Sequence, residues 1–539
     1  MEKCDVIIIG AGPNGIAAGA YLARAGLKVL LLERRIEAGG GLATEEVTLP
    51  GYMHNTHSIY HMMVDYAPIY RDLQLEEKYH LRHVFPELQC ALLLKDGRSL
   101  CLYDDLDKTC ESIARFSKRD SESYRKTYQK VWEFTEYYLA PATYDLAHSP
   151  LLAAAKLEAS DWGKELISYS PKSPRRIVDE VFENEHVRTL WLYLLCHWGI
   201  QHDMQGLGYL ALLYLNRSSK YRLVVGGSHM LSQAICKDIV ENGGMIWGSQ
   251  RIKRIIIEEG KAKGVEFEDG SVMEARVVVS SIDPYQTFFK LAGKEHLESD
   301  FAERLEDYQW EKWSLITAHL ALSGIPQFRA ASTNPDVNRS LVYLMGYETT
   351  DDLVKHWKAI EKGETCETYG FECSFPSIHD SSQAPPDRHT GLITQMAPYT
   401  LKDGGADRWY DYRFKEEQMA HRLEILAQYA PNMKEILLWH SFFTPLDIEN
   451  KFHDMVMGSY KQGAYLPLQM GYNRPNEYCS RYRTPIKSLY LCGSSCHPGG
   501  MIIWGGGYNA AGVIADDLGI KRWWAEPEIV RRARDKGLM

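Results

Sequence analysis

The N-terminal stretch constrains the fold of this chain more than any other part of it. Residues 5–35 read DVIIIGAGPNGIAAGAYLARAGLKVLLLERR. Val6–Ile9 is a β-branched run that suits a strand buried on both faces. A glycine-rich turn follows, then a helix that begins at Pro13, then a second apolar strand that ends at Glu33. The order strand, tight turn, helix, strand predicts one unit of a parallel α/β sheet.

The glycines of this turn have the spacing that binds the pyrophosphate of a dinucleotide. Gly10 permits the tight turn, Gly12 lets the backbone approach a phosphate, and Gly15 allows the helix to pack on the strand. The helix from Pro13 directs free N–H groups and its positive end at the phosphates. Glu33, 18 residues after Gly15, can accept hydrogen bonds from ribose hydroxyls and would repel a 2′-phosphate. The pattern therefore favours FAD or NAD over NADP.

A second glycine cluster selects between these two dinucleotides. Gly39, Gly40 and Gly41 lie in the stretch AGGGLATEE, a few residues after Glu33. Three consecutive glycines let the backbone pass very close to a ligand, here the pyrophosphate and ribityl chain of FAD. An NAD enzyme has no need of a second cluster of this kind. The sequence therefore predicts FAD.

Length and charge exclude some classes of protein. A chain of 539 residues is too long for one compact core. The formal net charge is -10, whereas binding to nucleic acid normally needs a basic surface, so no nucleic-acid partner is expected.

Targeting signals and cysteine usage bear on the compartment. No run of about 18 apolar residues predicts a membrane-spanning helix, and the N-terminus lacks the pattern of a signal peptide. The 11 cysteines are scattered and form no CxxC pair, which fits a reducing, cytoplasmic location. The short apolar stretches 189–200 and 206–215 are typical of buried helices, and an apolar cap that contacts a membrane surface stays open as an alternative.

Three separate blocks of the sequence resemble one known family. The first is the N-terminal stretch through AGGGLATEE. The second, residues 223–284, begins LVVGGSHMLSQ and ends VVVSSIDP, and the third, residues 488–519, reads SLYLCGSSCHPGGMIIWGGGYNAAGVIADDLG. In this order they resemble the phytoene desaturase and carotenoid isomerase-like flavoproteins, within the amine-oxidase-type FAD superfamily.

The resemblance implies an α/β fold in which a Rossmann-like FAD-binding domain on a parallel sheet is discontinuous. It would comprise residues 1–65, 221–290 and 481–520. An interleaved α+β substrate or cap domain would comprise 66–220 and 291–480, and 521–539 would form a C-terminal tail. Trp523 and Trp524 could anchor that tail to the body, to a partner or to a membrane surface.

The resemblance also implies which residues contact the cofactor, in addition to the glycines and the acid of the N-terminal motif. The strand around Ile252 would pack on the adenine end, and the C-terminal block would lie along the flavin. The predicted cofactor-binding residues are Gly10, Gly12, Pro13, Asn14, Gly15, Glu33, Arg34, Gly40, Gly41, Leu42, Thr44, Ile252, Gly493, Gly500, Met501 and Ile502.

A histidine cluster follows the second glycine cluster. The stretch PGYMHNTHSIYH, residues 50–61, spaces His54, His57 and His61 by three and four residues, which on a helix would share one face. The ligand count suits zinc, but no carboxylate support is evident and the family resembled binds no catalytic metal, so no metal is predicted. Structural histidines and acid–base groups beside the flavin both stay open. Our candidate catalytic residues are His57 and His61, with Tyr60 as a weaker acid.

Residues and resemblance together predict an FAD-dependent oxidoreductase that desaturates or saturates C–C bonds of an apolar or unsaturated small molecule. Hydride would pass between a substrate carbon and flavin N5. The middle of the chain carries no second GxGxxG, which argues against a built-in NAD(P)H site. Electrons would therefore leave to oxygen or a quinone, or the reaction would be redox-neutral.

Two alternatives stay open. One is a redox-neutral isomerase or hydratase that uses reduced FAD on an alkene such as a carotenoid, a fatty acid or a small unsaturated acid. The other is a non-catalytic scaffold stabilised by FAD. The oligomeric state is not predicted.

Overall fold

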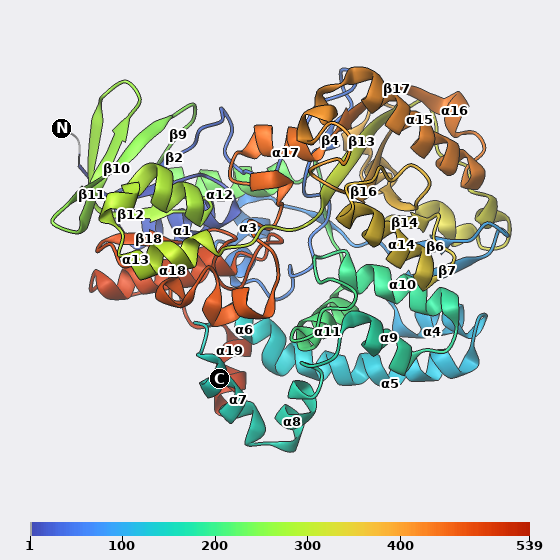
Figure 1. Cartoon of the computed structure of the whole chain (residues 1–539), viewed down its shortest axis with the longest axis horizontal. Coiled ribbons are helices and arrows are strands. Elements are labelled where there is room, and N and C mark those ends of the chain that lie inside the picture. Colours follow the sequence, from blue (N-terminus) through green and yellow to red (C-terminus); the bar gives the residue numbers. More distant parts are fainter. Residues whose placement is uncertain (1–2) are drawn as a thin grey trace.

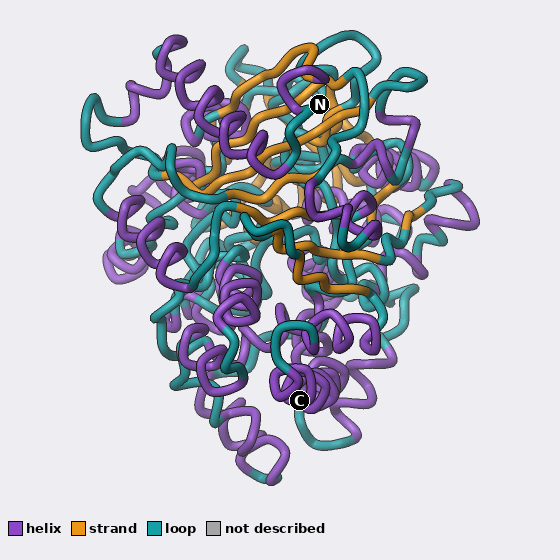
Figure 2. Tube along the Cα trace, turned by 90° about the vertical axis from the view of Figure 1, so that its right-hand side faces the viewer, coloured by secondary structure: helices purple, strands orange, loops and turns teal. Residues whose placement is uncertain are grey.

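The computed structural model describes residues 3–539. Two seven-stranded sheets form its framework, one at the left and one at the upper right of Figure 1. Seen from the side, the strands gather in the upper part of the molecule and helices fill the lower part, where the C-terminus lies (Figure 2). The α/β class predicted from the sequence, with a second unit of mixed structure, is confirmed.

The first sheet is parallel at its centre, as predicted. Parallel pairs join β9 to β2, β2 to β1, β1 to β12 and β12 to β18, and the antiparallel strands β10 and β11 extend the sheet beyond β12. Ile7 and Ile8 are 0% exposed because both faces of the sheet are covered. The strands are β1 (Lys3–Ile9), β2 (Val29–Leu32), β9 (Met245–Trp247), β10 (Ile252–Glu258), β11 (Lys261–Phe267), β12 (Val272–Ser280) and β18 (Leu489–Leu491).

Helix α1 (Pro13–Arg24) packs against two other helices beside this sheet. These are α12 (His229–Glu241) and α18 (Gly505–Asp517). The close packing expected at Gly15 is present, because a Cβ there would lie 2.2 Å from the carbonyl oxygen of Gly10. Gly10 itself has φ +88°, a conformation that glycine adopts at little cost.

The second sheet has the order β17-β13-β16-β15-β14-β6-β7 and is antiparallel except where β14 pairs with β6. The long strands β13 and β16 pair along their whole length, from Ser314 opposite Ala397 to Leu322 opposite His389. The strands are β17 (Leu437–Phe443), β13 (Ser314–Leu322), β16 (His389–Ala397), β15 (Phe371–Ser374), β14 (Val342–Met345), β6 (Leu88–Leu93) and β7 (Ser99–Tyr103).

The two faces of this sheet have different surroundings, because side chains alternate along each strand. Ala318 and Leu320 of β13 are buried in an apolar core that also contains Met419 and Leu426 of α15 (Tyr412–Tyr429). The next residues along β13, Leu315 and Thr317, belong to the opposite face and line a cavity described below.

Two short strand pairs and the remaining helices complete the fold. The pairs are β3 (Thr44–Glu45) with β4 (His54–Asn55) and β5 (His83–Val84) with β8 (Leu223–Val224). No helix within residues 3–539 is long and apolar enough to cross a membrane. The remaining helices are α2 (Pro68–Asp72), α3 (Leu75–Tyr79), α4 (Leu106–Ala114), α5 (Lys118–Phe134), α6 (Ala140–Thr143), α7 (Pro150–Glu158), α8 (Asp161–Ile167), α9 (Pro174–Val181), α10 (Glu185–Cys196), α11 (Gly208–Arg217), α13 (Ser299–Glu306), α14 (Thr350–Glu361), α16 (Met433–Ile436), α17 (Pro445–Phe452) and α19 (Glu528–Asp535).

The C-terminal tail packs on the body of the protein. The indole nitrogen of Trp523 donates to the carbonyl oxygen of Tyr21 on α1 at 2.9 Å, and the two rings stack with centroids 5.6 Å apart. Trp524 is 7% exposed. The structure thus shows contact with the body, one of the three anchors that the sequence left open.

Candidate functional site

A cavity of about 640 Å³ lies between the two sheets. The β1–α1 turn, Gly40 and Gly41, and the segments 250–253 and 494–502 line it from one side, and strands of the second sheet line it from the other. A volume of this size is typical of a cofactor or small-molecule site. The cavity therefore joins the three sequence blocks that resemble one family.

The N-terminal glycine motif forms one end of the cavity. Gly10, Gly12, Pro13 and Asn14 all line it, whereas Gly15 is packed against the turn behind them. A Cβ at Gly12 would meet no atom within 4 Å, so the backbone there is open to a ligand. Helix α1 begins at this point without a side-chain cap, so its first N–H groups are free to bind an anion.

Glu33 lies at the carboxyl end of β2 and lines the same end of the cavity. It is 9% exposed. Its carboxylate accepts hydrogen bonds from the N–H groups of Ala11 at 3.0 Å and Arg35 at 2.8 Å. These bonds fix the carboxylate beside the glycine turn, in the position that a ribose hydroxyl donor requires.

The second glycine cluster lies directly against the first. The N–H of Gly39 donates to the carbonyl oxygen of Ala11 at 2.8 Å, and a Cβ on Gly40 would lie 2.9 Å from the Cα of Gly12. Gly41 lies against the His57 ring, since a Cβ there would be 2.7 Å from His57 Cδ2. Gly40 and Gly41 both line the cavity. The backbones of the two glycine clusters thus lie against each other beside the cavity. Side chains at these positions would prevent this close approach.

The third segment contributes Met501 and Ile502 to the cavity wall. Gly493 and Gly500 are not among the lining residues; Gly493 packs on Ser281, where a Cβ would lie 2.4 Å from the carbonyl oxygen. The helix that follows, α18, also begins without a side-chain cap. Asn14 links the two helix starts, because its Oδ1 accepts from the N–H of Gly507 at 3.2 Å.

The other predicted cofactor residues divide into two groups. Arg34 and Ile252 line the cavity, and the Arg34 guanidinium also donates to the carbonyl oxygen of Lys451 at 2.7 Å. Leu42 and Thr44 are buried and do not line it. The Thr44 hydroxyl is engaged in the fold, where it donates to Asn55 Oδ1 at 2.9 Å. The roles of all these residues toward the cofactor stay predictions.

The histidine stretch is not helical, so the shared face expected for the three imidazoles is not formed. His54 lies in β4 and is buried, with Nε2 2.7 Å from the hydroxyl of Thr48. His57 lines the cavity, where burial and nearby Lys451 lower its pKa to about 4. His61 is 1% exposed, lies outside the cavity lining and has its pKa lowered to about 3 by burial and by His83.

The stretch does not form a helix because backbone groups of His54 and His61 pair with other segments, as strands do in a sheet. His54 pairs with Glu45 across β3 and β4, and His61 exchanges two backbone hydrogen bonds of 2.9 Å with Arg222. These pairings turn His57 and Tyr60 toward the cavity and His61 away from it. Within residues 3–539, no group of three His, Cys, Asp or Glu side chains is arranged to hold a metal ion.

A carboxylate that the sequence analysis missed lies at the other end of the cavity. Glu372 of β15 is 5% exposed and lines the wall. It accepts hydrogen bonds from the hydroxyls of Tyr60 at 3.3 Å and Tyr193 at 3.0 Å, and His197 Nδ1 lies 3.6 Å away. Burial and the carboxylate hold the pKa of Tyr60 well above its ordinary value, so the phenol remains a donor.

The apolar residues Trp198, Leu315, Leu392 and Phe443 share this wall with Glu372. The signal for Glu372 in the sequence is a single acid in the short apolar strand FECS. Only the neighbouring strands show that this acid faces a cavity and not solvent, because alternation by itself does not say which face is buried.

The sequence analysis also missed a buried amine next to the cavity. Lys461 is 0% exposed, and its Nζ lies 3.8 Å from the ring centroid of Tyr460, a residue of the cavity wall, without any hydrogen-bond acceptor. Burial lowers the pKa of this amine to about 7. The amine therefore titrates near neutral pH in an aromatic setting.

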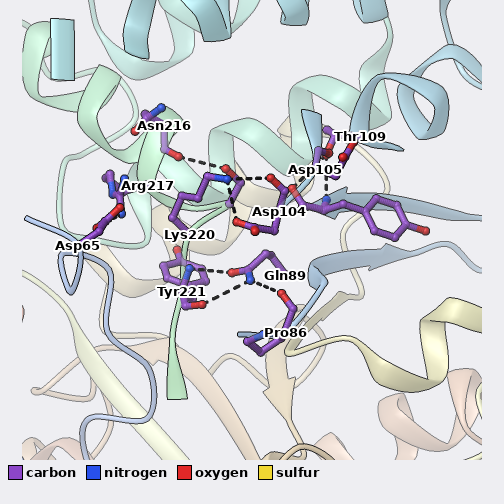
Figure 3. A network of polar contacts seen from close by, with 12 residues as sticks. Asp65, Pro86, Gln89, Asp104, Asp105, Thr109, Asn216, Arg217, Lys220 and Tyr221 are labelled. Atoms are coloured by element: carbon purple, nitrogen blue, oxygen red, sulfur yellow. Dashed lines mark hydrogen bonds and ion pairs between the residues drawn. The ribbon is translucent and has the colours of Figure 1, made fainter. Parts of the chain in front are cut away.

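A polar network holds the loop that carries Tyr60. Figure 3 shows Gln89 of β6 binding both backbone groups of Tyr221, through a bond of 2.7 Å to the N–H and one of 3.4 Å to the carbonyl. Lys220 donates to Asp104 at 2.8 Å in the same view. The Tyr221 ring then contacts the ring of Tyr60, with centroids 4.4 Å apart. The second sheet thereby fixes Tyr60 within reach of Glu372.

Comparison with known proteins agrees with this geometry. Residues 14–307 match the family described as flavin containing amine oxidoreductase. The chain is 38% identical to a limonene dehydrogenase subunit of Castellaniella defragrans, over 100% of this chain and 99% of the relative. It is 23% identical to a neurosporene-forming phytoene desaturase of Rhodobacter capsulatus, over 95% of this chain and 94% of the relative. A solved oxidoreductase from Methanosarcina mazei shares its fold with a TM-score of 0.61 at 16% identity, over 95% of this chain and 100% of that one.

The site is therefore that of an FAD-dependent oxidoreductase. The chain belongs to the flavin-containing amine oxidoreductase family, and the predicted likeness to phytoene desaturases is confirmed.

The cofactor of this protein is FAD, and the residues at the glycine end of the cavity are suited to bind it. The uncapped start of α1 and the open Gly12 backbone suit a pyrophosphate. Basic side chains line the same cavity: Arg34, Arg35, Arg251, Lys253 and Lys290.

Glu33 provides a test of cofactor binding. We expect Glu33→Gln to weaken FAD binding by roughly 10- to 100-fold, since a hydrogen bond to a charged group contributes about 1.5–3 kcal/mol. The dissociation constant is measured by titrating apoprotein with FAD. Glu37→Gln, at an exposed position nearby, serves as the control. An unchanged constant for Glu33→Gln would show that its carboxylate does not bind the cofactor.

His54 predicts a pH dependence of stability. Burial lowers its pKa to about 4, whereas in the unfolded chain it is about 6.5. Between these two pKa values the His54 imidazole is protonated mainly in the unfolded state. The stability that His54 contributes is therefore fully present above pH 6.5 and is lost as the pH drops toward 4, by up to about 1.4 kcal/mol per pH unit. We expect the melting temperature of His54→Gln holoprotein to fall less steeply than that of wild type between pH 6.5 and 5. Equal slopes for wild type and His54→Gln would show that His54 does not cause this pH dependence.

Proposed function

We propose that this protein dehydrogenates an apolar, unsaturated hydrocarbon and forms a new C=C bond in it. The observation that carries the proposal is a chamber with an apolar wall in which one carboxylate, Glu372, is held by two tyrosine hydroxyls. The similarity to a limonene dehydrogenase subunit and to a phytoene desaturase supports the same class of substrate, a terpene-type hydrocarbon.

The chemistry requires two groups at the chamber. When bound, FAD supplies a hydride acceptor at N5. Removal of a hydride from one substrate carbon and a proton from its neighbour leaves a C=C bond, and the two electrons of the first C–H bond leave with the hydride. The proton needs an acceptor in a place closed to bulk water.

We propose that Glu372 is the base that accepts the proton from the substrate. Its carboxylate lines the chamber, and the hydroxyls of Tyr60 and Tyr193 keep it in place. His197 Nδ1 lies 3.6 Å from the same carboxylate, within reach of a proton held there. The apolar side chains Trp198, Leu392 and Phe443 orient the hydrocarbon and exclude water.

An anaerobic titration tests the proposed function. Limonene added to wild-type holoprotein should bleach the flavin absorbance, with one more C=C bond in the product. The saturated analogue p-menthane, which has no allylic C–H bond, should leave the flavin oxidised. Turnover only after prior reduction of the flavin, without net consumption of reductant, would favour an isomerase or hydratase. Normal FAD loading without reduction by limonene or a carotenoid would favour a non-catalytic scaffold.

Substitution of Glu372 tests the assigned proton acceptor. We expect Glu372→Gln to lower the rate of flavin reduction by roughly 10²- to 10⁴-fold, the usual contribution of a general base, with unchanged flavin content. Stopped-flow absorbance gives the rate, and the exposed Glu361→Gln on α14 serves as the control. A wild-type rate in Glu372→Gln would rule out this role.

A further inference from the structure

A second cavity, of about 390 Å³, adjoins the first. Residues of α7, α8 and α11, together with those of the segments 138–148 and 465–473, surround it. Helices α7 and α8 form the lowest part of the molecule in Figure 1. Below, this space is called the antechamber and the 640 Å³ cavity the main cavity.

The antechamber is lined by uncharged side chains. No Asp, Glu, Lys or Arg is among the described residues that line it, in contrast to the main cavity, whose lining includes charged side chains such as Arg251 and Glu268. Most of the lining side chains are apolar, so the space favours apolar ligands. Polar groups are fewer and include His148, whose two ring nitrogens have no hydrogen-bond partner. Five of its lining residues are methionines, whose flexible side chains adapt to ligands of different shapes: Met62, Met63, Met470, Met501 and Met539.

Consecutive residues of one segment line the two cavities where they meet. Ile502 lines the main cavity, Ile503 lines the antechamber, and Met501 lines both. The Tyr214 hydroxyl lies 3.5 Å from the sulfur of Met501, and its ring stacks on Trp198 of the main cavity with centroids 6.2 Å apart.

The backbone of this segment is strained. Met501 has φ +80° and Ile502 has φ +54°, and a β-branched residue rarely adopts positive φ. Strained backbone of this kind is concentrated at ligand clamps and switch regions. It marks residues 501–502 as a segment held in place by its surroundings.

Exposed leucines flank the outer side of the antechamber. Leu151 is 82% exposed and follows the lining residue Pro150, and Leu468 is 86% exposed and follows the lining residue Pro467. Leu152 is 44% exposed on the same helix as Leu151. Large apolar side chains at such exposure cost free energy in water, and here they are neighbours in the chain of residues that line the apolar cavity.

From these observations we propose that the antechamber is a second binding site, which takes up an apolar hydrocarbon and passes it to the main cavity beside Met501. A cavity of 150 Å³ holds benzene, so by volume 390 Å³ accommodates roughly fifteen carbons. The inference rests on the proposed function for the identity of the ligand class, but binding to the antechamber is testable without turnover.

Helix α7 offers a matched pair of variants. Ala154 is half-buried and lines the antechamber, so Ala154→Phe places a ring in it. Ala155 is exposed on the same helix and is not a lining residue, so Ala155→Phe adds the same ring on the solvent side. Both variants leave the main cavity unaltered, and flavin content and melting temperature report whether each is folded.

Uptake of cyclohexane measures binding. This saturated hydrocarbon has no allylic C–H bond, and its partition between headspace and a holoprotein solution gives the number bound per molecule. We expect Ala154→Phe to bind about one cyclohexane fewer than wild type, and Ala155→Phe to match wild type. Equal uptake by wild type and a folded Ala154→Phe would overturn the proposal.

Steady-state kinetics with limonene and a soluble quinone, which reoxidises the flavin, measure delivery. We expect kcat/KM of Ala154→Phe to fall roughly tenfold, at the lower end of what small changes in apolar pockets achieve, while kcat stays near the wild-type value. Lowered uptake with unchanged kcat/KM would overturn the delivery role.

If limonene and carotenoids fail to reduce wild-type flavin, the proposed function is wrong. Loss of one bound cyclohexane in Ala154→Phe would then still support the antechamber as a hydrocarbon site.

Discussion

The parallel pairing of β1 with β2 on one side and β12 on the other is the constraint on which the site depends. Because parallel strands end at one edge of the sheet, Gly10, Glu33 and Ser281 come together although they are far apart in the sequence. The Ser281 hydroxyl donates to the carbonyl oxygen of Gly10 at 2.8 Å. A Cβ on Gly10 would lie 2.7 Å from that oxygen of Ser281. The contact tolerates only glycine, so the turn that faces the pyrophosphate is fixed by packing behind it.

The two ends of the main cavity have opposite chemical character. Free helix N–H groups and basic side chains such as Arg251 and Lys253 gather at the glycine end, where a charged cofactor binds. The far end is walled by one face of the second sheet, where Glu372 is surrounded by apolar residues. A buried carboxylate is costly unless it is hydrogen-bonded, and the hydroxyls of Tyr60 and Tyr193 meet that need. The fold thus separates cofactor binding from the chamber where a hydrocarbon fits.

The histidine stretch shows that residue spacing gives a wrong prediction when a helical period is assumed for a segment that is not a helix. Intervals of three and four residues bring side chains together only on a helix. Here the backbone of His54 and His61 is taken up by pairing with Glu45 and Arg222. The imidazoles therefore point to different surroundings, and only His57 of the three lines the cavity.

The sequence by itself determined the first sheet, its helices and the cofactor. Glycines at 10, 12 and 15, followed by Glu33, leave few conformations open, since their spacing matches one local backbone arrangement and one ligand. Local patterns of this kind are readable because neighbours along the chain are also neighbours in space. Only the tertiary structure decided that Glu372 and Lys461 lie at or beside the cavity, that His61 does not, and that a second cavity adjoins the first. Those positions depend on strand register in the second sheet and on contacts between residues hundreds of positions apart, and no local sequence pattern specifies either of these.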